Sequence, residues 1–477
     1  PPLTAIRSST VCFPKSSKEN SDAHIIYIIG LGVFSVTLSG VFRMGVFEFT
    51  KLVLEHLGLY LCILVCSILV YYKILRKICF SIVDPFFLAQ ISSLFAFMVA
   101  IFLFAIGEIE VSYGVQFLLT QIAFWIGIYR YNVNPVKYKL NTFDSYDYRQ
   151  AIRKREIHFL FCLFLIYICL QLFVYSQYGI PLFMKSRLGI YEDTGGGGIW
   201  GRMLTTLNVF VVIGCFFLRK ITRKHSSARI ITNTTLLFVG VTYLLSGSKS
   251  SIISLFSLYF CFMLMYEPYK IKRFRKFEIF GIVATVIVAL RVITIQNSTE
   301  SSLMLFINRL ISSGDVFYQG YFSNKIDALD VTTYSIFNDV LGTYRIMSWD
   351  DLPKPIGMQL YSLVYNIDLP MGANARHNYL GLVCFGMMGS ILFSYLIGVL
   401  LSYIRHKLHT RFYRKGILSV CFYALLLKAV CTVETDFTMF VASVNSFVLT
   451  CIILAAGFVF MILLGYVTYQ LANVGKR

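Results

Sequence analysis

The chain contains little charge for its length. Only 14% of its 477 residues are charged, whereas 57% are hydrophobic and the mean hydropathy is +0.70. A soluble protein of this size has too little interior to cover so much apolar surface. The composition therefore argues against a soluble enzyme and predicts a helical membrane protein with many spans.

Several motifs that carry chemistry in other proteins are missing. The twelve cysteines lie mostly singly inside apolar runs, without CxxC or Cys/His zinc spacing, so we expect neither a disulfide framework nor a metal site. GxSxG and HExxH are absent, and the GGGG run at 195–198 is not followed by GK[ST], which argues against a phosphate-binding loop. Residues 1–23 lack the apolar core of a signal peptide and are interpreted as a cytoplasmic tail.

Apolar runs of membrane-spanning length recur along the chain. The sequence predicts an all-α polytopic membrane protein with about twelve transmembrane helices. The first nine belong to residues 24–295 and the last three to residues 382–477, the second range ending in a short cytoplasmic tail. The runs lie near 24–42, 57–72, 85–106, 115–131, 157–178, 204–218, 230–246, 250–267, 278–295, 382–404, 416–433 and 440–468.

Basic segments follow every even-numbered run up to the tenth. Because positive loops stay on the cytoplasmic side, this pattern predicts that both termini are cytoplasmic. The net charge of +19 is then explained by topology and by contact with anionic lipid, and no nucleic-acid partner is expected. The basic segments are KILRK (73–77), RQAIRKREIH (149–158), RKITRKHSSAR (219–229), YKIKRFRK (269–276) and RHKLHTRFYRK (405–415).

Two sizeable hydrophilic segments project from the opposite, periplasmic side. They are residues 179–203 and 296–381. Long loops are commonly functional, so we expect the chemistry to lie on this side. The longer segment ends in MGANARHNYLG (371–381), which places Arg376, His377 and Asn378 where the loop is predicted to meet the membrane.

Cations on or near this side suggest an anionic ligand. They include Arg187, Lys249, Arg291, Arg309, Arg345 and Arg376. Arg291 interrupts the apolar run GIVATVIVALRVITI, where an arginine is costly without a partner or a wet cavity. Each cation taken singly is equally well explained by snorkelling to the interface. The set favours phosphate binding, because a guanidinium group binds two oxygens at once.

Histidine supplies a candidate proton acceptor. Only His56 and His377 are expected on the external side, and His377 is flanked by Arg376 and Asn378. An unperturbed pKa near 6.5 makes histidine suited to proton transfer at neutral pH. The alternative is that His377 merely caps the helix that starts near residue 380.

These features resemble the bacterial O-antigen polymerases of the Wzy family. That family often carries an Arg-x10-Gly pattern in each of two periplasmic loops. Arg187 with Gly198 and Arg309 with Gly320 match this pattern. NARHNYLGLVCFGMMGS also resembles the His-plus-Gly segment before a late span in these polymerases and in O-antigen ligases.

The resemblance implies an inverting, metal-independent glycosyltransferase of the GT-C type, without a cofactor. It would join oligosaccharide repeat units carried on undecaprenyl diphosphate at the periplasmic face of the bacterial inner membrane, and a chain-length regulator would be a further partner. We expect Arg309 and His377 to be catalytic, as charge stabiliser and base. Arg187, Arg291, Lys249 and Arg376 would bind the diphosphate, and Asn378 and Tyr379 would orient the histidine or a sugar.

Two alternatives remain open. An O-antigen ligase would use the same chemistry to pass glycan to lipid A core. A flippase or other transporter for lipid-linked oligosaccharides would place ionisable residues deep within several spans and show internal repeats. No repeat is visible in the sequence.

Overall fold

The computed structural model describes residues 45–81, 84–141, 146–148, 152–184, 198–222, 226–246, 251–271, 313–367 and 372–474. The predicted spans 24–42 and 278–295 lie outside these residues, as do Arg187, Lys249, Arg291 and Arg309. All of the described residues belong to one compact unit, Met44–Arg477.

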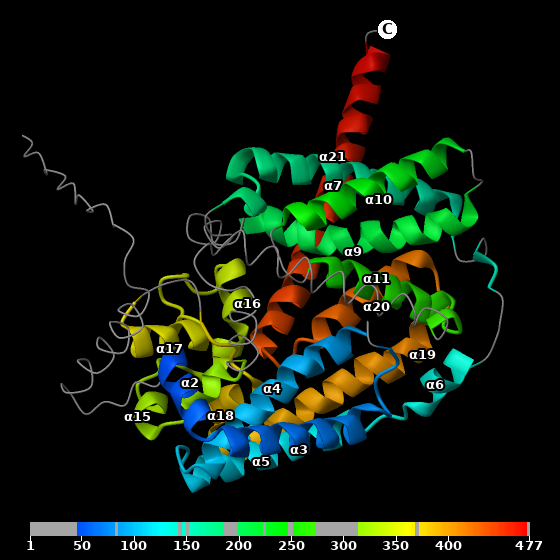
Figure 1. The fold of residues 1–477 in the computed structure, drawn as a ribbon. Coiled ribbons are helices and arrows are strands. Elements are labelled where there is room, and N and C mark those ends of the chain that lie inside the picture. The colour runs from blue at the N-terminus through cyan, green and yellow to red at the C-terminus, as the bar shows by residue number, and fades with distance from the viewer. Residues whose placement is uncertain are drawn as a thin grey trace, which may run out of the picture. The chain divides into compact units, whose positions relative to one another are not determined.

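The described part of the chain is helical and contains no strand (Figure 1). Eight helices are long and apolar enough to cross a membrane, which confirms a multi-pass membrane protein. They are α3 (Leu57–Leu75), α4 (Pro85–Ala105), α5 (Val111–Ile128), α7 (Lys154–Tyr178), α9 (Gly198–Ile221), α10 (Ser227–Leu245), α18 (His377–Ser402) and α21 (Phe437–Val474). Shorter apolar helices are α11 (Ser251–Tyr266) and α20 (Ile417–Val430). Ten of the twelve predicted runs overlap these helices, and the count of twelve spans stays a prediction.

The helices pack in two groups. In one, α9 contacts α7, α10, α11, α20 and α21; in the other, α3 packs on α4 and α5 packs on α18. Gly127 of α5 and Gly398 of α18 allow their backbones to touch, because a Cβ atom on either would lie closer than 3.0 Å to backbone of the other helix. Small residues at such crossings let membrane helices approach closely.

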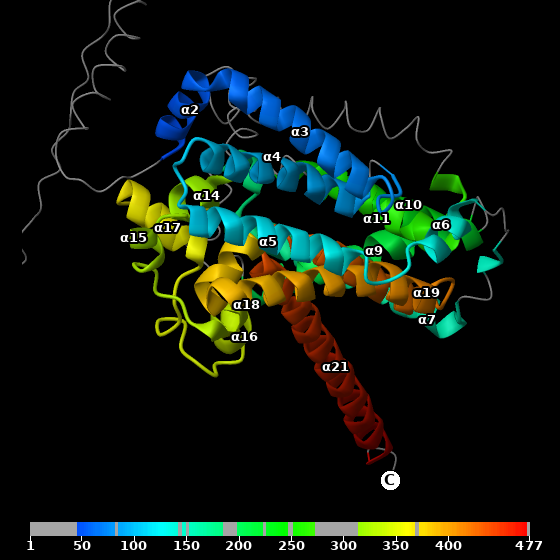
Figure 2. The same ribbon diagram turned by 90° about the horizontal axis from the view of Figure 1, so that it is seen from below.

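The described parts of the basic segments lie at one end of the bundle, together with α6 (Asn134–Asn141) and α19 (His409–Phe412) (Figure 2). Lys137 of α6 donates to the Arg76 carbonyl at 3.2 Å, and Lys139 lies 3.8 Å from the centre of the Tyr413 ring. The π-helical turn Tyr403–Leu408 at this end carries Arg405, which pairs with the buried carboxylate of Asp84 at the start of α4. This arrangement is the one expected of loops that share a side, and its assignment to the cytoplasm rests on the positive-inside rule.

The opposite end is covered by four short helices and a 3-10 turn from the second predicted loop. These are α14 (Asp315–Gly320), α15 (Ser323–Ile326), the turn Thr333–Phe337, α16 (Asn338–Thr343) and α17 (Ile356–Tyr365), and we call them the cap. Helices α14 and α16 pack on α4 and α21, while α2 (Val46–Glu55) lies at the same end (Figure 2). Tyr318 and Tyr321 of the cap are fully buried, so this hydrophilic segment still contributes to the core.

Helix α18 is two helices in sequence, because its backbone leaves helical geometry at Gly386 (φ 70°, ψ −175°). The Nδ1 atom of His377 lies 2.9 Å from Oγ of Ser394, although these residues are 17 positions apart. A continuous helix would separate them by about 25 Å. The chain therefore reverses at Gly386, and residues 377–385 pack back against residues 387–402.

Candidate active site

Arg376 lies inside the bundle. Its side chain is 3% exposed, and its Nη2 atom donates to the Ser92 hydroxyl at 3.0 Å and to the Ser313 carbonyl at 3.2 Å. Its Nη1 atom donates to the Ser93 hydroxyl at 3.3 Å. Ser92 and Ser93 lie in α4, which starts at the basic end of the bundle. At a rise of 1.5 Å per residue they are about 10 Å from the start of this helix. Arg376, His377 and Asn378 therefore lie inside the helical bundle, because the chain reverses at Gly386. Their expected position where the loop meets the membrane stays a prediction.

His377 is completely buried and stacks on Phe124 of α5, with ring centres 4.6 Å apart. Its Nδ1 atom is within hydrogen-bond distance of the Ser394 hydroxyl. Its Nε2 atom has no hydrogen-bond partner among the described residues. When Nδ1 carries the proton and donates to Ser394, Nε2 offers the lone pair that a base requires.

Asn378 is bound to α5. Its amide donates to the Thr120 hydroxyl at 2.9 Å and to the Gln121 side-chain oxygen at 3.3 Å, and its carbonyl accepts from Gln116 at 3.0 Å. The side chain within hydrogen-bond distance of the His377 imidazole is thus that of Ser394 rather than Asn378. The difference arises because the hairpin brings residues from beyond Gly386 to the histidine.

Tyr379 connects the start of α18 with the cap. Its hydroxyl donates to the Gly320 carbonyl at 3.2 Å, and its ring packs edge-on against Tyr321 at 5.5 Å. The side chain is fully buried in this contact. Gly320, which matches the Arg-x10-Gly pattern, therefore lies against the segment that carries the histidine, where any side chain would collide with the Tyr379 ring.

Glu434 completes the cluster and was not singled out from the sequence. It is 3% exposed, its carboxylate accepts from the Gln90 amide, and its carbonyl accepts from the His377 amide at 3.4 Å. In the sequence it belongs to the segment VETDF (433–437), which matches no catalytic motif. No local pattern shows that a carboxylate between α20 and α21 reaches α4 and α18.

A cavity of about 180 Å³ lies between the cap and the segment that leads into Arg376. Asn374, Ala375 and Asp436 contribute to its wall, as do Asn338 of the cap and Lys354, which precedes α17. Burial raises the pKa of Asp436 above its usual range, although hydrogen bonds from Thr438 oppose the shift. The cavity thus offers the amide of Asn374 and the carboxyl of Asp436, which are two residues from Arg376 and Glu434 respectively, together with the amine of Lys354.

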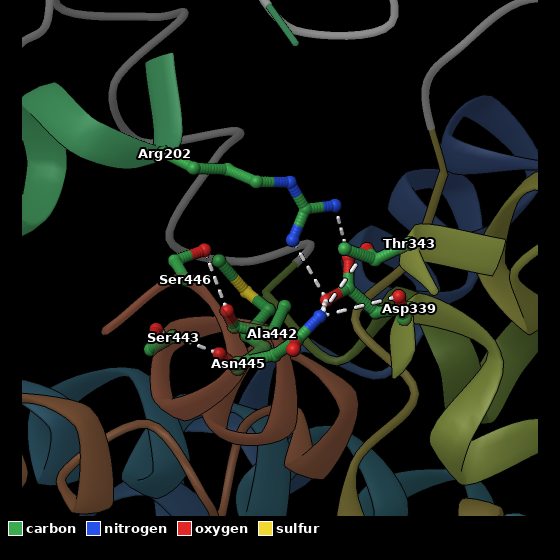
Figure 3. A network of polar contacts seen from close by, with 8 residues as sticks. Arg202, Asp339, Thr343, Ala442, Ser443, Asn445 and Ser446 are labelled. Carbon is green, nitrogen blue, oxygen red and sulfur yellow. Dashed lines mark hydrogen bonds and ion pairs between the residues drawn. The ribbon is translucent and has the colours of Figure 1, made fainter. Parts of the chain in front are cut away.

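An ion pair connects the cap with two spans (Figure 3). The Arg202 guanidinium of α9 donates to both carboxylate oxygens of Asp339, at 2.9 and 2.6 Å, and Asn445 of α21 donates to Asp339 Oδ2 at 2.7 Å. Burial opposes ionisation of Asp339, but the hydrogen bonds from Arg202 and Asn445 and the charge of Arg202 outweigh it, so the pKa of Asp339 is lowered. The Asp339 carboxylate therefore holds the cap to α9 and α21.

The segments that lead to Arg187 and Lys249 end at a common cavity. Pro181 on one side, and Ser246 and Ser254 on the other, contribute to the wall of a space of about 300 Å³ between α7, α9 and α10. Arg187 and Lys249 themselves lie outside the described residues, together with Arg291 and Arg309. No three His, Cys, Asp or Glu side chains in the described part of the chain are placed to hold a metal ion.

Comparisons of the chain with protein-family models, with curated proteins and with solved structures gave no match.

Proposed function

We propose that this protein polymerises oligosaccharide repeat units carried on undecaprenyl diphosphate, at the periplasmic face of a bacterial inner membrane. The observation that supports this most is that Arg376 and His377 are adjacent at the start of the α18 hairpin. They directly follow Ala375, which belongs to the wall of the cavity between the cap and this segment. Histidine can accept the proton of an acceptor hydroxyl, and arginine can stabilise the charge of a departing diphosphate without a metal ion.

In the proposed reaction, the acceptor hydroxyl attacks the anomeric carbon of the donor glycan as the bond to the diphosphate oxygen breaks. The hydroxyl proton passes to Nε2 of His377, and the negative charge stays on the diphosphate. Fixed guanidinium groups stabilise that charge strongly in a site of low dielectric constant. Arg376 is held in place for this role by four hydrogen bonds, which its guanidinium donates to oxygens of Ser92 and Ser93 in α4 and to the Ser313 carbonyl.

Access to His377 requires movement of the chain above it, because the ring is completely buried. Gly357 of α17 and Gly372 lie backbone against backbone beside the 180 Å³ cavity. In our proposal, the acceptor sugar occupies this cavity and reaches Nε2 when the segment 372–375 shifts. Asp436 and Asn374 supply hydrogen-bonding groups for sugar hydroxyls in that position.

The remaining cations enter the proposal as predicted from the sequence. Arg309 stabilises the leaving group, and Arg187, Lys249 and Arg291 bind the diphosphate. A regulator of chain length remains a proposed partner.

A second candidate is a transporter of lipid-linked oligosaccharides. The helix that reverses inside the bundle and the buried Arg376 and Glu434 favour it, because broken helices and ionisable residues in the membrane interior are typical of transporters. The separate cap over one end argues for chemistry there instead.

The proposal is tested by glycan gels from a strain in which the gene is deleted. A single repeat unit on lipid A core without a ladder supports the polymerase. Bare core with accumulated polymer would indicate the ligase, and a cytoplasmic backlog of lipid-linked units would indicate the transporter.

Complementation with Arg309→Ala should leave the ladder absent, and Arg309→Lys should be impaired because a lysine cannot bind two oxygens in the same geometry. Normal ladders with either variant would exclude that role for Arg309.

A further inference from the structure

An apolar groove runs along one face of α10. Its volume is about 550 Å³, and its wall includes Leu237, Val241 and Leu244, which are 70%, 44% and 53% exposed. Gly240 lies in the middle of this face, and a Cβ atom added there would meet no heavy atom within 4 Å. Because α10 is a candidate span, the groove is open to the hydrocarbon region of the membrane.

One end of the groove is cationic. Arg219, in the last turn of α9, contributes to its wall together with Asn233 of α10. Arg229 is close by, since its guanidinium donates to the Arg219 carbonyl. Glu267, a carboxylate at this end of the bundle, pairs with Lys220 at 2.8 Å and with Lys270 at 2.6 Å. Among the described residues, no carboxylate pairs with Arg219.

We propose that this groove binds one anionic phospholipid, with an acyl chain along α10 and the phosphate at Arg219. An apolar groove that ends at a guanidinium group without a carboxylate partner among the described residues complements a molecule with one hydrocarbon end and one phosphate end. Arg219 belongs to the basic end of the bundle, so the lipid comes from the leaflet that this end faces. The proposal does not depend on glycosyl transfer.

The test uses the full-length protein in nanodiscs of phosphatidylcholine with a minor fraction of phosphatidylglycerol. The protein is extracted in mild detergent, and the two lipids that remain bound are measured by mass spectrometry. We expect phosphatidylglycerol to be enriched relative to the nanodisc. Arg219→Gln should lower this enrichment roughly fivefold, the effect of losing one cation near an anionic headgroup. Gly240→Leu should also lower it, because the new side chain would occupy the groove.

Two matched variants separate this site from general effects. Gly58→Leu places the same side chain at another helical glycine with open space around it, and Arg76→Gln removes another cation from the basic end. Both should keep the enrichment. The proposal is overturned if the unmodified protein shows no enrichment, if Arg219→Gln and Gly240→Leu leave it unchanged, or if the two controls reduce it equally.

Discussion

Ser394 lies on the far side of the turn at Gly386 from His377, yet its hydroxyl oxygen is 2.9 Å from Nδ1 of the histidine. This contact fixes the imidazole at a point that a straight helix would leave far from Ser394. It also leaves Nε2 without a partner among the described residues. The proposed base is thus a consequence of the hairpin.

His377→Gln should abolish long glycan chains, because an amide cannot accept and release the proton of the acceptor hydroxyl. Loss of a general base typically lowers the rate by about 10² to 10⁴. Chain length is measured on glycan gels, and the amount of protein in the membrane by immunoblot. His56→Gln is the control, since His56 is exposed on α2–α3 and takes no part in the cluster. Ladders of normal length from His377→Gln would refute the role of base.

Gly386→Ala should destabilise the fold by about 1 to 3 kcal/mol, because φ 70° with ψ −175° is a conformation adopted almost only by glycine. A Cβ atom there meets nothing within 4 Å, so only the backbone is affected. Thermal unfolding of the detergent-solubilised protein measures the change. Gly240→Ala also enters open space but at an ordinary helical φ, and it should be neutral or slightly stabilising. Equal stability of the two variants would contradict the reversal.

Gly357→Ala should disrupt the contact between α17 and the segment before Arg376. Its Cβ atom would lie closer than 3.0 Å to the backbone of Ala373, which cannot rotate away. We expect a loss of about 1 to 3 kcal/mol, as for other overpacked sites, together with shorter glycan chains. Unfolding temperature and glycan gels provide the two measurements. Gly58→Ala, in open space on α3, should change neither measurement. If Gly357→Ala also changed neither, the close backbone contact between α17 and this segment would be refuted.

Asp339→Asn should weaken attachment of the cap at neutral pH by about 1 kcal/mol, the order of a favourable surface ion pair. Since the pKa of Asp339 is lowered in the folded protein, its carboxylate stabilises the fold above the unfolded pKa of about 4. That contribution is lost as the pH falls through the lower, folded value.

Unfolding temperatures measured between pH 7 and pH 3 should therefore fall less steeply for Asp339→Asn than for the unmodified protein. Glu55→Gln removes an exposed pair with Lys51, whose side chains are 50% and 72% exposed, and should leave the profile unchanged. Parallel profiles for Asp339→Asn and the unmodified protein would show that this ion pair does not hold the cap.

Much of the helical architecture was predictable because membrane helices follow directly from hydrophobic runs of sufficient length. The runs near 57–72 and 85–106 coincide closely with α3 and α4. The run near 382–404 overlaps α18, but hydropathy did not show that this helix begins at His377 and that the chain reverses at Gly386. Hydropathy does not show such a reversal, because it is averaged over a window that includes both halves of the hairpin.

The sequence by itself determined that this chain is a helical membrane protein, since apolar composition and span length depend only on local residues. It also singled out Arg376 and His377, because their chemistry differs from that of the lipid-like residues around them. Only the tertiary structure decided that Ser92, Ser394 and Glu434 surround them. Those contacts join residues up to 284 positions apart, and such pairings depend on how helices pack rather than on any local pattern.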